Sequence, residues 1–448
     1  MKDIRNEGHI ARRRMLKRTP KLLAGTVAAL MAVGGSALPA TANPVRQSSA
    51  VVHLTYWTGW SGLWATRVQD QVDQFNKTHP DIQVSVLSTP SNSYTKLLAA
   101  IAAGDPPNAY ADLTAQGPAE LAAKGAVVPL TQFMTGRYKK FASWLYPIAK
   151  DYVSYKGQLY GVPMYFDVYL LYYNKGMMQK AGLNPAHPPT TLTQFEADQA
   201  KEWKVSGGQV SQIGFYPYAE GNNTQYLTAS FGDLSFYNNG KWNFTRNQNA
   251  KNMFKFLASF KKYPYSAATG LITAVTPQGG SIDAFDIGKI GFWISGLWEI
   301  SQLQETKPPI KWGVEPLPGS ASSAYFDMNL DEIPKGASHQ RATFEFLTWL
   351  SGYDNTSYRA KSVQLYGQPS SPAVVDTKTY QTYLDALPAR REFIRVLSNT
   401  RDPSIPRTCV APEYMTDLDT VVQSVEAGKM TAAAGLASIQ KSMNAAKC

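Results

Sequence analysis

The chain of 448 residues is 44% hydrophobic and 17% charged, which excludes disorder for most of its length and favours two or three domains of ~150 residues. Its two cysteines exclude a disulfide scaffold, a four-cysteine zinc site and an iron–sulfur protein. The net charge of +11 does not indicate a nucleic-acid partner, because residues 1–42 contribute +6 (eight Lys and Arg, two Asp and Glu) and no dense basic run follows them.

The first 42 residues have the layout of a cleavable export signal. A basic stretch runs from Arg12 to Lys21, an uncharged segment rich in Leu, Ala and Val follows, and Ala40-Thr41-Ala42 is a small-x-small cleavage site. The paired arginines before Leu16-Lys17 resemble a twin-arginine signal. A permanent membrane anchor is the alternative, but glycines dilute the apolar segment. No Cys lies near the cleavage site, so we expect a soluble mature protein without a lipid anchor, in the periplasm or at the extracellular face of the membrane.

The first part of the mature chain alternates predicted strands with predicted helices. Strands rich in β-branched and aromatic residues are expected over 51–57, 82–86 and 109–111, and helices with an apolar stripe over 62–77, around 97–101 and over 118–124. Strands that alternate with helices predict right-handed crossovers, an α/β fold and a mostly parallel sheet.

The apolar run 160–174 predicts a long strand that continues from one domain into the next. The other expected elements are a helix over 178–210 broken at Pro188-Pro189, a hairpin over 235–244 with Asn239-Gly240 at its turn, helices over 248–262 and 337–351, strands over 290–293 and 312–317, and two final helices separated by Gly428.

The sequence has no motif for catalysis, phosphate binding or metal binding. The phosphate loop, the glycine-rich dinucleotide motif, H-E-x-x-H and G-x-S-x-G are all absent, so we expect no enzyme, no metal ion and no cofactor. Two carboxylate pairs, Asp283 with Asp286 and Asp327 with Asp331, could serve glycoside hydrolysis, although turn and surface roles are favoured for them. An exported chain with 25 Tyr and 10 Trp and no reaction chemistry favours a binding role.

Nine short motifs occur in order between residues 50 and 445: Leu54-Thr55-Tyr56-Trp57; Tyr94-Thr95-Lys96-Leu97 with Gly104-Asp105-Pro106-Pro107; Tyr160-Gly161-Val162-Pro163; Leu171-Tyr172-Tyr173-Asn174-Lys175 before Ala181-Gly182-Leu183; Pro189-Thr190-Thr191-Leu192; Gly288-Lys289-Ile290-Gly291-Phe292 before Gly296-Leu297-Trp298; Pro316-Leu317-Pro318-Gly319; Ile333-Pro334-Lys335-Gly336; and Ala427-Gly428-Lys429. With these motifs the chain resembles the extracellular solute-binding proteins of ABC importers, carbohydrate-binding family 1, the group that includes maltose-binding protein.

The resemblance implies a type II periplasmic-binding-protein fold, in which three hinge crossovers join two α/β lobes and the ligand lies in the cleft between them. The crossovers are expected near 163–168, 313–316 and 367–374, with lobe one over 50–165 and 315–368 and lobe two over 166–314 and 369–448. In open α/β sheets, ligands bind outside the carboxyl ends of the strands. Trp57 ends the first predicted strand, so it is expected to point towards the ligand.

A sugar presents an apolar C–H face and a rim of hydroxyls, so aromatic planes and carboxylate or amide groups are the expected contacts. The expected ligand-binding residues are Trp57, Trp60, Trp64, Asp112, Gln116, Asp167, Asn222, Trp298, Glu299 and Tyr414. Core packing is the alternative for Trp60 and Trp64. The resemblance makes Trp298 the sugar-stacking tryptophan, whereas Ala115 stands where an acid would serve maltodextrin, which disfavours maltose itself.

The expected function is therefore that of a monomeric sugar or oligosaccharide receptor, which closes by hinge bending and delivers its ligand to an ABC permease. The alternatives are a receptor for a polyamine, glycerol phosphate or ferric ion, and a secreted carbohydrate-active enzyme. Arg is sparse in the loops above, which disfavours a phosphate ligand. Cys409 and Cys448 are expected to form a disulfide after export, with two unrelated thiols as the alternative.

Overall fold

In the computed structural model, residues 50–448 form one compact unit. The structure describes residues 50–89, 93–112, 117–217, 226–231, 236–238, 240–275, 284–307, 309–319, 323–399 and 405–448. The predicted export signal over 1–42 lies outside the described residues, and so do Gln116, Asn222, Asn239 and Asp283.

Strands and helices alternate at the start of the chain. The elements are β1 (Val52–Thr58), α1 (Gly62–Thr78), β2 (Ile82–Ser88), α2 (Ser93–Ala103), β3 (Ala109–Asp112), α3 (Ala119–Ala123), η1 (Leu130–Phe133), η2 (Gly136–Lys140), α4 (Phe141–Trp144), α5 (Pro147–Tyr152), β4 (Ser154–Tyr155), β5 (Gln158–Leu159) and β6 (Gly161–Asn174). This order confirms the predicted strands and helices of the first part and the long strand over 160–174.

The middle of the chain supplies a second group of strands and helices. They are α6 (Lys175–Lys180), α7 (Leu192–Glu202), β7 (Lys204–Ser206), β8 (Gln209–Phe215), η4 (Leu227–Phe231), β9 (Tyr237–Asn238), β10 (Lys241–Trp242), α9 (Gln248–Ala258), η5 (Ser259–Lys262), α10 (Tyr265–Val275), β11 (Ile290–Ser295), α11 (Leu297–Thr306) and β12 (Trp312–Glu315). β9 and β10 pair antiparallel, which confirms the predicted hairpin over 235–244.

The last part of the chain contains one further long strand and is otherwise mostly helical. Its elements are β13 (Tyr325–Glu332), α12 (Gln340–Ser351), α13 (Thr356–Ser362), η6 (Val363–Leu365), β14 (Gln368–Pro369), α14 (Pro372–Val375), α15 (Lys378–Asp385), α16 (Ala389–Asn399), α17 (Ala411–Glu426) and α18 (Ala432–Ala445). The two final helices on either side of Gly428 are confirmed, whereas β13 has no counterpart among the predicted elements.

The predicted helix over 178–210 is wrong in its last part. Helix α7 ends at Glu202, and β7 and β8 then form an antiparallel hairpin across Gly207-Gly208. Both glycines have positive φ, +56° and +77°. Two such residues form the mirror-image turn that matches the twist of a hairpin, so the Gly-Gly pair overrides the helical pattern.

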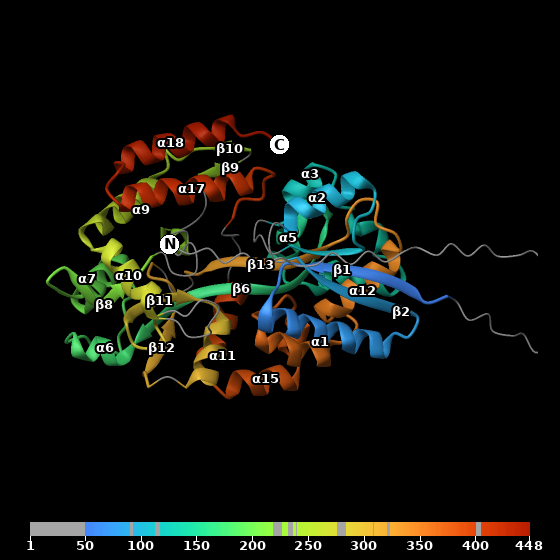
Figure 1. The fold of residues 1–448 in the computed structure, drawn as a ribbon, viewed down its shortest axis with the longest axis horizontal. Coiled ribbons are helices and arrows are strands. Elements are labelled where there is room, and N and C mark those ends of the chain that lie inside the picture. Colours follow the sequence, from blue (N-terminus) through green and yellow to red (C-terminus); the bar gives the residue numbers. More distant parts are fainter. Residues whose placement is uncertain are drawn as a thin grey trace, which may run out of the picture. The chain divides into compact units, whose positions relative to one another are not determined.

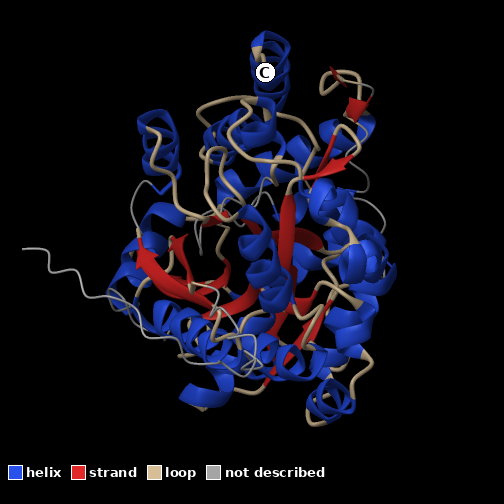
Figure 2. Ribbon diagram, turned by 90° about the vertical axis from the view of Figure 1, so that its right-hand side faces the viewer, coloured by secondary structure: helices blue, strands red, loops and turns tan. Residues whose placement is uncertain are grey.

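One sheet of 10 strands runs through the described unit, in the order β2-β1-β3-β13-β6-β11-β8-β7, with β12 and β14 also paired to β6. Figure 2 draws the strands in red, with helices around them. β1 pairs in parallel with β2 and β3, and β11 with β8. β13 and β6 pair antiparallel with each other and with their other neighbours. The prediction of a mostly parallel sheet is therefore wrong for the centre, because the unpredicted β13 lies between β3 and β6.

Strand β6 is the centre of the core, and all 14 of its residues are buried. β13 and β14 flank its first half, and β11 and β12 flank its second half. Figure 1 shows β6 and β13 side by side through the middle of the unit, with α1, α11 and α15 on one side of them. Burial on both faces explains why the β6 sequence reads as a nearly continuous apolar run.

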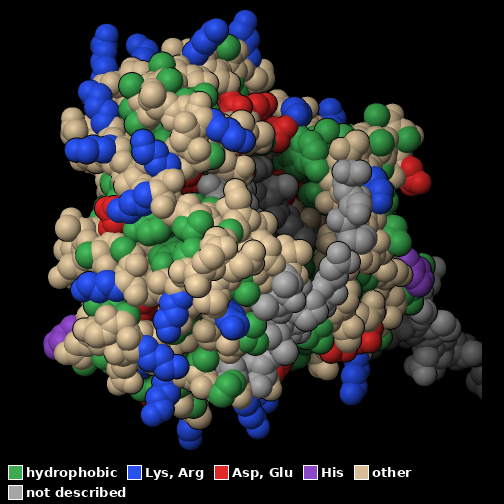
Figure 3. Space-filling view, turned by 60° about the vertical axis from the view of Figure 1, so that its left-hand side comes forward, with side chains coloured by type: hydrophobic (Ala, Val, Ile, Leu, Met, Phe, Trp, Pro, Cys, Tyr) green, Lys and Arg blue, Asp and Glu red, His purple; other side chains and the backbone are tan. Residues whose placement is uncertain are grey.

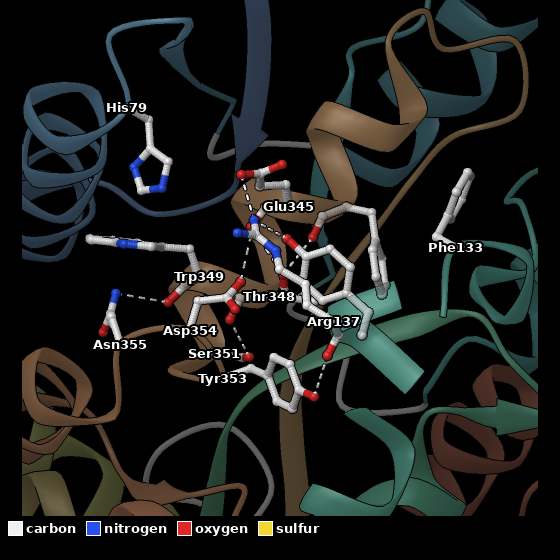
Figure 4. Close-up of polar contacts among 12 residues, drawn as sticks. His79, Phe133, Arg137, Glu345, Thr348, Trp349, Ser351, Tyr353, Asp354 and Asn355 are labelled. Carbon is white, nitrogen blue, oxygen red and sulfur yellow. Dashed lines mark hydrogen bonds and ion pairs between the residues drawn. The ribbon is translucent and has the colours of Figure 1, made fainter. Parts of the chain in front are cut away.

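Helix α12 is fixed to η2 by buried rings and a polar network. Arg137 Nη2 lies 2.6 Å from Glu345 Oε1 and 3.9 Å from Asp354 Oδ2, and the Tyr353 hydroxyl donates to the Arg137 carbonyl at 2.9 Å (Figure 4). These charges are partly exposed, so each ion pair contributes less than about 1 kcal/mol. The fully buried Phe344 supplies more of the packing energy.

On one face of the molecule the basic side chains are dispersed. On the face drawn in Figure 3, Lys and Arg side chains are spread from edge to edge rather than gathered in one patch. Within the described ranges, no helix is both long enough and apolar enough to cross a bilayer.

A disulfide joins Cys409 to Cys448, with Cα atoms 5.4 Å apart and a sequence separation of 39. It connects the end of the chain after α18 to the segment before α17. These two helices pack against each other and against α9. The disulfide therefore joins the start of α17 to the end of α18, at the opposite end of the helix pair from the turn at Gly428.

Replacing Cys448 by Ser should lower the free energy of unfolding by about 3–4 kcal/mol, because the closed loop restricts the unfolded chain. Urea unfolding of the exported protein measures this. Cys409→Ser should have the same effect, and the double variant should be no less stable than either single variant. Two titratable thiols in denatured, unreduced wild-type protein would contradict the disulfide.

Candidate ligand-binding site

A cavity of about 470 Å³ lies at the centre of the described unit. Six aromatic and four hydrogen-bonding side chains line it: Trp60, Trp64, Tyr165, Asp167, Tyr169, Trp298, Gln302, Asp327, Asn329 and Tyr366. This mixture of flat apolar surfaces with a few polar groups is typical of small-molecule sites.

The floor of the cavity is built by the pairing of β6 with β13. Side chains at alternate positions of a strand share a face, so Tyr165, Asp167 and Tyr169 point to the same side of β6. Asn329 and Asp327 stand opposite the first two of these residues in the register. Asn329 Nδ2 donates to Asp167 Oδ2 at 2.6 Å, and the Tyr169 hydroxyl donates to Asp327 Oδ2 at 3.3 Å.

One wall of the cavity comes from the start of α1. The ring centroids of Trp60 and Trp64 are 5.4 Å apart, and Trp64 is 5.5 Å from Tyr366. Tyr366 in turn lies 5.3 Å from Tyr165 on the floor. The tryptophans are only partly buried and contact each other, so they present ring surface to the cavity rather than filling the core.

A second wall comes from the start of α11, where Trp298 is the second helical residue. Its ring folds back over Gly296, and a Cβ at that glycine would overlap the ring. The ring also meets Tyr169 edge to face at 5.2 Å. Gly296 thus allows the close approach that sets the direction of Trp298.

An ion pair joins the two helices that carry these tryptophans. Arg67 Nη2 of α1 lies 3.6 Å from Glu305 Oε1 of α11, and the Arg67 guanidinium lies 4.7 Å from the Trp64 ring centroid. Arg67 lies one helical turn after the cavity residue Trp64, and Glu305 lies one turn after the cavity residue Gln302.

The acids of β13 are buried, which corrects the predicted turn and surface roles of Asp327 and Asp331. Their exposed fractions are 7% and 1%. Burial raises the pKa of Asp327 to about 7, against the opposing effect of its hydrogen bonds with Asp167 and Tyr169. Burial likewise raises the pKa of Asp331 to about 7, although the Tyr56 hydroxyl donates to it at 2.9 Å.

Four of the ten predicted ligand-binding residues line the cavity: Trp60, Trp64, Asp167 and Trp298. Four others lie elsewhere. Trp57 packs on the small apolar cluster with Leu97, and Asp112 is buried at the end of β3. Glu299 accepts a hydrogen bond from Ser295 at 3.2 Å, and Tyr414 stacks on Trp242 at 5.1 Å. Gln116 and Asn222 lie outside the described residues.

Sequence analysis does not predict six of the lining residues as ligand contacts: Tyr165, Tyr169, Gln302, Asp327, Asn329 and Tyr366. It names Asp327 only as half of a carboxylate pair with Asp331. The sequence does carry a signal for Tyr165 and Tyr169. Each lies two positions from Asp167 in a predicted strand, so each should share the face of the strand on which Asp167 lies. Gln302 stands four positions after Trp298, which is one turn along the same helix. The register that brings β13 to β6 could not be read from the sequence. Among the described residues, no group of three or more His, Cys, Asp or Glu could hold a metal ion.

A family model described as "Bacterial extracellular solute-binding protein" matches residues 70–389. The chain belongs to this family. Similar curated proteins include the sn-glycerol-3-phosphate-binding periplasmic protein UgpB of Yersinia enterocolitica, which is 32% identical over 157 residues, 34% of this chain and 36% of that protein. UgpB of Brucella abortus is 31% identical over 176 residues, 38% of this chain and 39% of that protein. The match thus spans little more than a third of the length of these relatives.

Solved structures of similar fold cover most of the chain. CpMnBP1 with mannotriose bound is 25% identical with a TM-score of 0.75, covering 88% of this chain and 100% of that one. The ABC substrate-binding protein Lmo0181 of Listeria monocytogenes, in complex with cycloalternan, is 23% identical with a TM-score of 0.72, covering 88% and 98%. The predicted α/β, two-lobe fold of solute-binding proteins is confirmed, and the family and these neighbours are binding proteins.

Asp327→Asn should change how stability depends on pH. The folded state of the wild type holds a proton on Asp327 up to a pKa of about 7, whereas its ordinary value is 3.8. Because the folded state binds more protons in this window, the wild type should lose stability as pH rises from 4 to 7. Relative to the wild type, Asp327→Asn should gain roughly 1–3 kcal/mol over the same interval.

Urea unfolding at pH 4, 5.5, 7 and 8 measures the difference. Asp81→Asn, which changes an exposed carboxylate, is the control and should follow the wild type. Parallel stability curves for Asp327→Asn and the wild type would overturn the assignment.

Proposed function

We propose that the protein is the extracytoplasmic substrate-binding component of an ABC importer, which binds a sugar or oligosaccharide in the central cavity and delivers it to the membrane permease. The observation that carries this proposal is the cavity itself, with six aromatic rings around four hydrogen-bonding side chains in about 470 Å³. Aromatic planes cover sugar C–H faces, and carboxylate and amide groups bond the hydroxyls. The mannotriose complex of CpMnBP1 supports the same ligand class.

The two lobes are proposed to be residues 50–165 with 315–368 and residues 166–314 with 369–448. The pairing of β6 supports this division, because its two halves belong to different groups of strands. β12 ends at Glu315, and β14 covers Gln368–Pro369, so the three proposed crossovers near 163–168, 313–316 and 367–374 all meet at β6. Bending there would move α1 against α11 and close the cavity on its ligand.

A binding role fits the two carboxylates of the cavity better than catalysis does. Glycosidases hold their two carboxyl groups about 5–10 Å apart across the scissile bond. Asp167 and Asp327 instead each accept a hydrogen bond from a neighbour on the cavity floor, Asp167 from Asn329 and Asp327 from Tyr169. We further propose a monomer that is exported by a cleavable signal over 1–42 and is not lipid-anchored, since no Cys lies near the cleavage site.

Trp298→Ala should weaken sugar binding by about tenfold or more while the protein folds normally, because a stacking plane is lost. A thermal-shift screen with mannobiose, mannotriose, maltose and other saccharides first identifies a ligand, since saturation at 100 Kd adds roughly 2.7 kcal/mol to stability. Calorimetry then gives the affinity of each variant.

Two variants serve as controls for this loss. Trp298→Phe keeps a ring and should retain most of the affinity. Trp203→Phe should bind like the wild type, because Trp203 stacks on Tyr263 away from the cavity residues. Unchanged affinity in Trp298→Ala would refute the stacking role.

Arg407 favours an anionic solute as the second candidate ligand. Its guanidinium lies 3.4 Å from the Tyr152 ring centroid, and its Nε is 3.9 Å from Asp151 Oδ2. Within the described part of the chain, its three nitrogens are buried without a hydrogen-bond partner. Guanidinium donors suit phosphate, and the Yersinia relative is named for glycerol 3-phosphate. Arg407 does not line the central cavity, which is why this candidate ranks second.

If the second candidate is correct, sn-glycerol 3-phosphate should raise the melting temperature and glycerol should not. Arg407→Gln should then abolish the shift, while Arg391→Gln, at an exposed ion pair with Asp385, should leave it intact. Under the sugar proposal, glycerol 3-phosphate produces no shift in any of these proteins.

A further inference from the structure

A small annex adjoins the central cavity. Its volume is about 20 Å³, which is room for one water-sized group. The annex and the cavity share four lining residues: Trp60, Tyr165, Asn329 and Tyr366. A ligand in the cavity can therefore reach the annex with a single small substituent. Two charged residues, Asp331 and Arg359, line the annex and not the cavity.

Each of these two charged residues has one buried polar atom without a partner in the described part of the chain. Both residues are only 1% exposed. Asp331 Oδ1 accepts from the Tyr56 hydroxyl at 2.9 Å, and Oδ2 is unpartnered. Arg359 donates through Nη1 to Gln71 at 3.2 Å and through Nη2 to the Met164 carbonyl, and Nε is unpartnered. Unpaired atoms of buried charged groups are costly, so they indicate a polar occupant of the annex.

A hydrogen-bond relay directs a third polar group of the annex. Arg359 donates to the Gln71 amide oxygen, so the Gln71 amide nitrogen is the atom that faces Tyr366. This nitrogen donates to the Tyr366 hydroxyl at 2.7 Å. Because the Tyr366 oxygen accepts this bond, its own proton is available to donate to an occupant.

The three groups together match the bonding capacity of one hydroxyl. A sugar hydroxyl has two lone pairs and one proton, which suit two donors, Arg359 Nε and Tyr366, and one acceptor, Asp331 Oδ2. A cation in the annex would meet the guanidinium charge, and an anion would meet the carboxylate charge. An apolar group would leave the buried atoms unpaired, and a water would bring a second proton that these three groups do not accept.

Resting on the proposed function, we propose that the annex is a subsite for one hydroxyl group of the bound saccharide, which accepts hydrogen bonds from Arg359 and Tyr366 and donates one to Asp331. A deoxygenated or methylated position lacks the proton that Asp331 accepts. The subsite therefore selects saccharides that carry a free hydroxyl at the one position that enters the annex.

Calorimetry at pH 8 with mannobiose and its monodeoxy derivatives tests the subsite, with maltose and its derivatives in their place if mannobiose gives no thermal shift. The carboxylate is ionised at this pH, because burial raises the pKa of Asp331 only to about 7. In the wild type, the derivative without the annex hydroxyl should bind about 10- to 100-fold more weakly than its parent, since a hydrogen bond with a charged group is lost.

A variant and a matched control show whether this loss arises at the annex. In Asp331→Asn the same derivative should lose only a few-fold, because the amide puts a donor where the carboxylate accepts, and the two changes are therefore coupled. Glu202→Gln changes another fully buried acid, one that lines neither the annex nor the cavity. It should keep the full loss seen in the wild type.

A crystal structure of the wild type with the same parent saccharide gives a readout that needs no variant to fold. A saccharide oxygen within hydrogen-bond distance of Arg359 Nε and Asp331 Oδ2 would support the subsite. A water in that place, or equal deoxy losses in the wild type and Asp331→Asn, would overturn the subsite and leave the sugar receptor standing. If no saccharide of the screen binds, the proposed function fails and the subsite fails with it.

Discussion

The antiparallel pairing of β6 with β13 is the constraint on which the rest of the structure depends. The register runs from Gly161 opposite Glu332 to Tyr169 opposite Tyr325. Side chains alternate along both strands, so a slip of β6 by one residue would turn Asp167 into the core and Phe166 into the cavity. Phe166, Val168 and Leu170, which alternate with the cavity residues, are fully buried. The hydrophobic burial that stabilises the centre therefore also fixes which polar groups face a ligand.

The same strand connects parts of the chain that are far apart in sequence. β6 accepts partners along its whole length, and its last residue, Asn174, caps α6 by accepting from the Gly176 and Met177 amides at 3.0 Å. Because α1 and α11 attach to different groups of strands around β6, the proposed bending of this strand would change the distance between Trp64 and Trp298. The Arg67–Glu305 pair spans the same two helices. As Glu305 is largely exposed, the pair costs little to break, which suits the proposed opening of the cavity.

What the sequence could and could not predict follows from the kind of signal each element carries. Trp298 is found because it lies in a motif with a fixed place in the family, Asp167 because it falls at the expected first crossover, and Trp60 because it directly follows a strong strand. β13 is missed because its Asp and Asn residues at alternate positions look like an exposed strand or turns. They are polar because they face a cavity that no local pattern reveals. The Gly207-Gly208 hairpin, by contrast, did carry a local signal, which the helical pattern around it outweighed.

A raised carboxyl pKa does not by itself mark a ligand site in this protein, and Glu202 shows why. Burial raises its pKa to about 9, and both of its oxygens lack a hydrogen-bond partner among the described residues. Yet it packs beneath the sheet against Gly291, where a Cβ would collide with it, and it lines no cavity described here. Its pKa is raised first by burial and then by the nearby Asp198 charge, with no ligand site involved. Asp327 differs because it combines burial with a second carboxylate, aromatic walls and open volume. The geometry around the acid, rather than the acidity itself, distinguishes the floor of the cavity from an ordinary buried acid.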